Sequence, residues 1–136
     1  MKNVVITGVS SGIGLAITRV FAAAGYKIFG SVRKKEDALR LKEELGDAYE
    51  PLFFDLTDDD AIKAEAARVA ELVGHQGIQL LVNNGGISGG DAIMHVSIDY
   101  MKHIYDVNTL GLLRVSQAFF PLLKISSANN SFSTSK

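Results

Sequence analysis

Two periods of apolar and polar positions alternate along the chain, and they predict strands and helices in regular succession. Short β-branched runs predict buried strands, whereas apolar residues three and four positions apart predict helices with one buried face. The predicted strands are residues 4–6, 27–32, 52–54 and 78–82, and the predicted helices are residues 15–24, 36–45, 59–73 and about 97–120. Gly25, Gly46 and Gly74 end the first three helices, and Pro121 ends the fourth.

This unbroken alternation predicts an α/β fold with a doubly wound parallel sheet, right-handed crossovers and helices on both faces. Residues 1–136 form a single predicted domain, because no repeat, low-complexity tract or linker interrupts them before the last dozen positions. A hydrophobic content of 47% in 136 residues is enough for one core.

Charge and residue usage exclude several classes of partner. A net charge of -1 gives no reason to expect nucleic acid or an anionic membrane. Without cysteine the chain can form neither disulfides nor thiolate metal sites. His75, His95 and His103 lack metal-ligand spacing, so we expect no metal and interpret them as surface or satisfied histidines.

The first residues and the lengths of the apolar runs predict a cytoplasmic protein. Met1–Asn3 leads straight into the first strand and leaves no room for a signal peptide. No apolar run approaches the roughly 20 residues that span a bilayer.

A glycine-punctuated turn joins the first strand to the first helix, with the spacing G-x-x-x-G-x-G at Gly8, Gly12 and Gly14. Such a turn can hold a phosphate at the helix N-terminus. Gly8 lets the backbone turn, Gly12 lets a pyrophosphate approach, and Gly14 lets the helix pack on the strand. Free N–H groups and the hydroxyls of Ser10 and Ser11 would be the donors. The alternative is that the glycines serve turn geometry alone.

Three motifs together resemble the classical short-chain dehydrogenase/reductase family over residues 2–136. They are Thr7–Gly14, Asn83–Gly86 and Asn108 within Asp106–Thr109. The resemblance implies a Rossmann-type fold and an oxidoreductase that transfers a hydride between a nicotinamide cofactor and a carbonyl or alcohol. In that family the residues that hold the pyrophosphate and adenosine side correspond here to Gly8, Ser10, Ser11, Gly12, Ile13 and Gly14.

The end of the second strand favours NADP(H) over NAD(H). Sites that prefer NAD place an acidic residue there for the ribose 2′-hydroxyl. Here Val32 is followed by Arg33, which could form charge-assisted bonds to a 2′-phosphate. The alternative is a solvated charge run with Lys34 and Lys35.

The next two strand ends carry further cofactor candidates. By resemblance Asp55 accepts a bond from the adenine amino group, with Leu56 alongside; alternatively, Asp55 caps the following helix. Asn83 is as suited to tying neighbouring strands together as to contacting the cofactor. Gly85 stands where the family usually has alanine, and leaves space for the cofactor ribose.

Asn108 lies in a predicted helix, although asparagine disfavours helix interiors. By resemblance it holds a water in a proton relay, and it could equally mark a helix kink.

The last residues depart from the family, whose chemistry needs a tyrosine four positions before a lysine. The tail places Phe132 four positions before Lys136, and phenylalanine has no hydroxyl to transfer a proton. Ser127 matches the family serine by its Ile-Ser-Ser context, and Lys136 would hold the nicotinamide ribose. A fifth strand is cut to Ile125 and its neighbours, and the later family elements are missing. A disordered tail that matches by chance is the alternative.

Three explanations of this end remain open: a natural remnant, an engineered Tyr→Phe fragment, or a longer chain of which residues are missing here. We favour the third, because the apparent losses remove loop-prone segments and the sheet edge. An intact mass of 14.6 kDa would contradict it.

The sequence therefore predicts an NADP(H)-dependent oxidoreductase with catalytic positions Asn108, Ser127, Phe132 and Lys136, and with at most trace turnover while Phe132 is present. The alternative is a non-catalytic dinucleotide-binding module or sensor. The expected partners are a small carbonyl or alcohol substrate, with no nucleic acid and no membrane. The resemblance also implies homo-oligomers through the fifth and following helices, although the following helix is absent here.

Overall fold

A four-stranded parallel sheet forms the centre of the computed structural model, which describes residues 2–90 and 92–133. The strands are β1 (Asn3–Ile6), β2 (Lys27–Val32), β3 (Tyr49–Phe53) and β4 (Leu80–Val82). Their spatial order is β3-β2-β1-β4, and Val5 of β1 lies opposite Phe29 and Leu81. The predicted parallel α/β sheet is confirmed.

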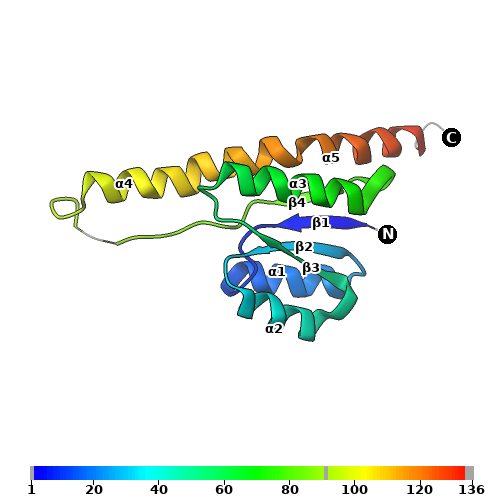
Figure 1. The fold of residues 1–136 in the computed structure, drawn as a ribbon, viewed down its shortest axis with the longest axis horizontal. Coiled ribbons are helices and arrows are strands. Elements are labelled where there is room, and N and C mark those ends of the chain that lie inside the picture. Colours follow the sequence, from blue (N-terminus) through cyan, green and yellow to red (C-terminus); the bar gives the residue numbers. More distant parts are fainter. Residues whose placement is uncertain (1, 91, 134–136) are drawn as a thin grey trace.

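Helices cover both faces of this sheet (Figure 1). On one face lie α1 (Gly12–Ala23) and α2 (Lys35–Leu45), and on the other lie α3 (Asp59–Val73) and α5 (Gly111–Ser133). A π-helical turn, η3 (Asp106–Leu110), joins α4 (Ile98–Tyr105) to α5, and the three form one long rod. Two short 3-10 turns, η1 (Gly46–Ala48) and η2 (Gly74–Gln76), follow α2 and α3.

Alternation along the strands sends side chains into two separate cores. Val4 and Ile6 of β1 pack toward α1 and α2, whereas Val5 between them packs toward α3 and α5. Neighbouring side chains of a strand point to opposite faces, so a strand that is apolar throughout fits a sheet buried on both sides. This placement fixes the carboxyl ends of all four strands along one edge.

Strand β3 begins earlier than residues 52–54, which the sequence pattern predicted. Tyr49 pairs with Ile28, is fully buried, and donates a hydrogen bond from its hydroxyl to the Gly30 carbonyl at 3.1 Å. Pro51 lacks a backbone N–H, but β3 is an edge strand, where that loss is tolerated.

The predicted helix end at Pro121 and the predicted short strand at Ile125 are both wrong. Pro121 lies inside α5, which continues to Ser133. A proline removes one helical hydrogen bond, but the flanking residues Phe119 and Leu122 are buried in the core and hold the helix in place. The helix therefore passes through the proline and includes Ile125.

No helix among residues 2–90 and 92–133 is both long and apolar enough to cross a membrane.

Candidate functional site

A cavity of about 280 Å³ opens at the carboxyl edge of the sheet. The ends of all four strands line it, together with two residues from the helical rod. This is the place where ligands of open α/β sheets bind. Strands β2 and β3 are added on one side of β1 and β4 on the other, so the strand order reverses between β1 and β4. The lining residues are Gly8, Ser10, Ser11, Ser31, Val32, Arg33, Phe54, Asp55, Leu56, Asn84–Ile87, His103 and Val107.

The glycine turn has the geometry that the sequence predicted. Gly8 has a φ of 70°, a region that favours glycine, and Gly12 has a φ of 58° with open space where a Cβ would stand. A Cβ on Gly14 would lie 1.9 Å from the carbonyl oxygen of Gly8. Gly14 therefore permits the close contact between α1 and the β1 turn.

The N-terminus of α1 presents free donors toward this turn. Ser11 is the N-cap residue, and its side chain accepts no hydrogen bond from the first turn among the described residues. The first backbone N–H groups of a helix have no intrahelical acceptor, and they attract anions. Together with the turn they form a site that suits a phosphate group.

Three polar side chains hold the β1 turn to its neighbours. Thr7 Oγ1 accepts hydrogen bonds from the N–H groups of Asn84 at 3.0 Å and Gly85 at 2.7 Å. Asn84 Nδ2 donates to the carbonyl oxygens of Thr7 and Gly8 at 3.2 and 3.0 Å. The hydroxyl of Ser31 accepts from the N–H of Gly8 at 3.0 Å. Sequence reasoning gave Thr7 and Ser31 no role, because their partners lie 23 to 78 positions away.

Arg33 follows the last residue of β2 and lines the cavity. Val32 before it is buried, whereas Arg33 is exposed. Within residues 2–90 and 92–133 the guanidinium makes no hydrogen bond or ion pair, so its donors stay available to a ligand.

Asp55 forms a tight turn at the end of β3 and does not cap the following helix. Its Oδ1 accepts from the N–H and the hydroxyl of Thr57, at 3.0 and 2.9 Å. Asp58 caps α3 by accepting from the N–H of Ala61 at 3.0 Å. The pKa of Asp55 is lowered, first by the Thr57 backbone hydrogen bond and to a lesser extent by the charges of Arg33 and His103. Asp55 therefore presents an ionised carboxylate to the cavity at neutral pH.

Asn83 and Gly85, which follow β4, contact different parts of the structure. Asn83 Nδ2 donates to the hydroxyl of Ser116 on α5 at 3.2 Å, so it ties the end of β4 to a helix and not to a neighbouring strand. Gly85 lines the cavity. A Cβ there would lie 3.1 Å from Thr7 Oγ1 and 3.2 Å from Leu56 Cδ1, so the backbone packs tightly.

Asn108 lies in the π-helical turn η3, a feature that often marks functional sites. Its Oδ1 accepts from the N–H of Ile87 at 2.8 Å, and its Nδ2 donates to the Ile87 carbonyl at 2.7 Å. Sequence reasoning singled out Asn108 by its poor helix preference. The structure shows that its amide holds the loop after β4 against the cavity.

Replacing Asn108 with alanine should lower the free energy of unfolding by about 2 kcal/mol, because the N–H and C=O of Ile87 lose their partners in a half-buried place. Hydrogen exchange should show loss of protection at the Ile87 amide. Thr109→Ala, an exposed change in the same turn, is the control and should leave that amide protected. Unchanged Ile87 protection in Asn108→Ala would contradict this role.

Arg114 of α5 connects η3 to Leu56 at the cavity. Its guanidinium donates to the Leu56 carbonyl at 2.9 Å and to the Asp106 carbonyl at 3.1 Å, and it pairs with Asp106 Oδ1 at 2.5 Å. These bonds fix Leu56 beside the cavity. Sequence reasoning missed this pair, because residues eight positions apart are not neighbours on a helix surface.

Ser126, Ser127 and Asn129 in the tail lie away from the cavity. Ser127 follows Ser126, whose hydroxyl accepts from Gln79 Nε2 at 3.1 Å, and Asn129 Nδ2 donates to the His75 carbonyl at 2.6 Å. Gln79 and His75 precede β4, at the end of the sheet opposite the cavity. Ser127 is held there because α5 continues as a helix. Phe132 lies in the last turn of α5, and Lys136 lies outside the described residues.

The site residues therefore fall into two groups. The structure brings Ser10, Ser11, Arg33, Asp55, Leu56 and Gly85 to one cavity with Gly8, whereas Ile13 in the first turn of α1 is exposed and does not line it. Ser127 lies apart. Among the described residues no cluster of histidine and acidic side chains could hold a metal ion.

The Rossmann arrangement for binding dinucleotides combines a parallel sheet, a glycine-rich turn and a cavity at the point where the strand order reverses. All three are present here. The family model described as short chain dehydrogenase matches residues 2–131. The chain belongs to the short-chain dehydrogenase/reductase family.

Relatives and solved structures agree with this assignment. An NADPH-dependent 3-dehydrocapnine reductase of Ornithobacterium rhinotracheale is 41% identical over 123 residues, covering 90% of this chain and 44% of that protein. A serine 3-dehydrogenase of Agrobacterium fabrum is 36% identical, covering 89% and 48%. The NADPH-bound carbonyl reductase from chicken fatty liver superposes with a TM-score of 0.87 at 30% identity, covering 96% and 51%. The chain spans about half the length of these relatives.

Proposed function

We propose that this chain binds NADP(H) at the cavity and forms the cofactor-binding part of an oxidoreductase that interconverts a carbonyl compound and its alcohol. When bound, NADP(H) supplies or accepts the hydride. A relative and a solved structure whose names include NADPH support the choice of cofactor.

Arg33 is the observation that carries this proposal. It lies at the end of β2, lines the cavity, and keeps its guanidinium donors free of partners among the described residues. Val32 occupies the preceding place, where an acidic residue would select a ribose 2′-hydroxyl. A guanidinium there suits a phosphate, because it offers paired donors and a permanent charge.

The other cavity residues provide for the rest of a dinucleotide. The turn from Gly8 to Gly14 and the first N–H groups of α1 would bind the pyrophosphate. The ionised Asp55 would accept from the adenine amino group, with Leu56 beside it. Asn108 would hold Ile87, and with it the loop after β4, in a fixed position at the cavity, so that the nicotinamide half of the cofactor has room to bind.

The proton that completes carbonyl reduction needs a separate donor. Phe132 has no ionisable group, and Ser127 lies at the opposite end of the sheet. We therefore propose that the cavity residues bind and orient the cofactor, and we do not assign Ser127 to the substrate carbonyl in this arrangement.

Calorimetric titration with NADPH and NADH tests the proposed function. The protein should bind NADPH more tightly than NADH. Arg33→Gln should weaken NADPH binding about tenfold, because a charge-assisted hydrogen bond is lost at an exposed site, and should change NADH binding little.

Lys34→Gln is the matched control, since Lys34 is a neighbouring exposed cation that does not line the cavity. It should leave both affinities nearly unchanged. Equal affinity of the unaltered protein for NADH and NADPH would contradict the proposed preference. If Arg33→Gln and Lys34→Gln lose the same NADPH affinity, Arg33 acts only through its general positive charge and not through direct contact with the 2′-phosphate.

A further inference from the structure

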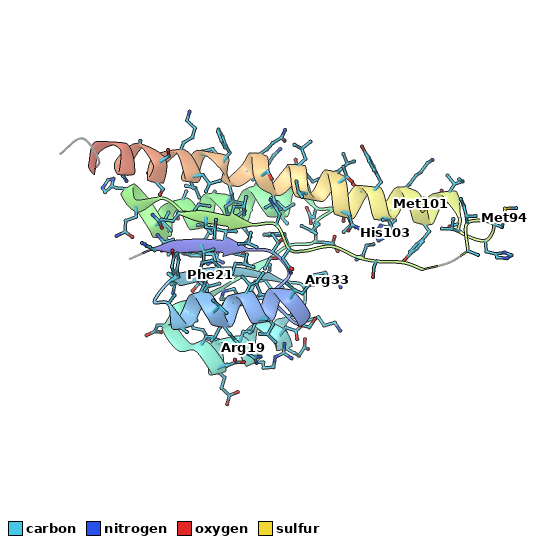
Figure 2. The ribbon with its side chains drawn as sticks, turned by 180° about the vertical axis from the view of Figure 1, so that it is seen from behind. Arg19, Phe21, Arg33, Met94, Met101 and His103 are labelled. Atoms are coloured by element: carbon cyan, nitrogen blue, oxygen red, sulfur yellow. The ribbon has the colours of Figure 1, made fainter. Side chains whose placement is uncertain are left out.

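His103 extends the charged lining of the cavity from its far side. It lies in the last turn of α4, one helical turn before Val107, which lines the same cavity. Figure 2 shows His103 on the long helical rod and Arg33 at the sheet below it, both at the cavity end of the molecule. The sequence pattern gave no sign of this placement, because the two residues are 70 positions apart.

Three ionisable side chains line the cavity among the described residues: Arg33, Asp55 and His103. After the larger contribution of the Thr57 hydrogen bond, the charge of Arg33 and that of a protonated His103 both lower the pKa of the Asp55 carboxyl. With a neutral imidazole, the charges of Arg33 and Asp55 cancel. With a protonated imidazole, the cavity lining carries one net positive charge.

Other charged groups around His103 are few. The loop of residues 85–90 that packs below α4 contains no ionisable side chain. On the helix itself, Asp99 and Asp106 lie one turn away on either side, and Lys102 is adjacent in sequence. Asp106 is already paired with Arg114. The imidazole forms no hydrogen bond with any described residue, so it is available to a ligand.

We propose that His103 is a pH-dependent selectivity residue of the cavity, and that its protonated form favours a nucleotide that carries a 2′-phosphate over one that lacks it. This inference rests on the proposed function. A 2′-phosphate adds about −1.5 to −2 charge near pH 7, so one added positive charge in the lining stabilises that ligand more. The residue is exposed, which limits the effect to several-fold.

The sign of the pH dependence follows from linkage. An anionic ligand binds the protonated imidazole better, so the added selectivity is present when the imidazole is charged and is lost at higher pH, where it is neutral. The 2′-phosphate itself gains a proton as the pH falls through about 6 and so carries less negative charge. This weakens its binding at acidic pH and opposes the effect of the protonated imidazole. That contribution belongs to the ligand and is the same for every variant, so comparison between variants removes it.

Adenosine 5′-phosphate and adenosine 2′,5′-bisphosphate are suitable probes, because they differ by the 2′-phosphate alone. Their dissociation constants would be measured by calorimetry at about pH 6 and about pH 8. The quantity of interest is the ratio of the two constants, which reports selectivity for the 2′-phosphate. Thermal unfolding of each variant at both pH values confirms that the compared proteins are folded.

Between the two pH values, the selectivity of the unaltered protein should fall about threefold more than that of His103→Gln. His103→Lys keeps its charge at both values and should retain high selectivity throughout. His95→Gln removes a histidine that does not line the cavity, and it should behave as the unaltered protein.

The outcomes separate the two proposals. If both nucleotides bind but His103→Gln keeps the pH dependence of the unaltered protein, the role of His103 is overturned and the proposed function stands. If the unaltered protein binds neither nucleotide, the proposed function is overturned and the role of His103 falls with it.

Discussion

Replacing Gly14 with alanine should lower the free energy of unfolding by about 3 kcal/mol. The added Cβ would lie 1.9 Å from the carbonyl oxygen of Gly8 and 2.5 Å from Asn84 Nδ2. Neither atom can withdraw freely, since Gly8 belongs to the turn and Asn84 Nδ2 donates to the carbonyls of Thr7 and Gly8. Relief of the overlap requires α1 to move away from β1.

Gly12→Ala is the matched comparison, two positions earlier. A Cβ there would stand in open space, so only its left-handed φ of 58° opposes alanine. This backbone strain costs about 1 kcal/mol. Urea unfolding of both variants should therefore show the smaller loss for Gly12→Ala. Equal losses would mean that backbone conformation, and not the contact with Gly8, explains Gly14.

Replacing Thr7 with valine should cost about 3 kcal/mol of stability and weaken nucleotide binding, although valine has nearly the same shape as threonine. The Thr7 hydroxyl is buried and accepts from the N–H groups of Asn84 and Gly85. Valine leaves both donors without that acceptor. The loop after β4 would then lose its fixed distance from the β1 turn.

Thr7→Ser separates the hydrogen bonds from the packing. Serine keeps the oxygen and loses one methyl group, which should cost about 1 kcal/mol. Urea unfolding gives the stability of each variant, and calorimetry with NADPH gives its affinity. If Thr7→Ser is as destabilised as Thr7→Val, the methyl group and not the hydroxyl secures this part of the site.

The sheet and its site edge could be predicted from sequence because their signals are local. Val4, Val5 and Ile6 are apolar and β-branched, and Gly8 follows at once, so strand and turn are specified within a few residues. The predicted spans of β2 and α3 agree with the structure. Arg33 and Asp55 were placed at the cavity because the carboxyl ends of parallel strands share an edge.

The remaining features depend on contacts that a single sequence does not display. Tyr49 extends β3 because its ring fills the space that Gly30 leaves, and this pairing is visible only after folding. Ile125 and Ser127 read as a strand end by their resemblance. They remain helical because Leu122 and Ser126 pack against the turn before β4, where the N–H of Ile78 donates to the Leu122 carbonyl at 3.2 Å.

The hydrogen bonds between Thr7 and Asn84 also constrain the order in which the protein folds. Strands β1 and β2 pair across only 24 positions, from Asn3 to Lys27, whereas Thr7 and Asn84 are 77 positions apart. Contacts distant in sequence carry a larger loop-closure entropy and slow the folding of a domain. The ends of all four strands line the cavity, so the cavity is complete only when the entire sheet has formed.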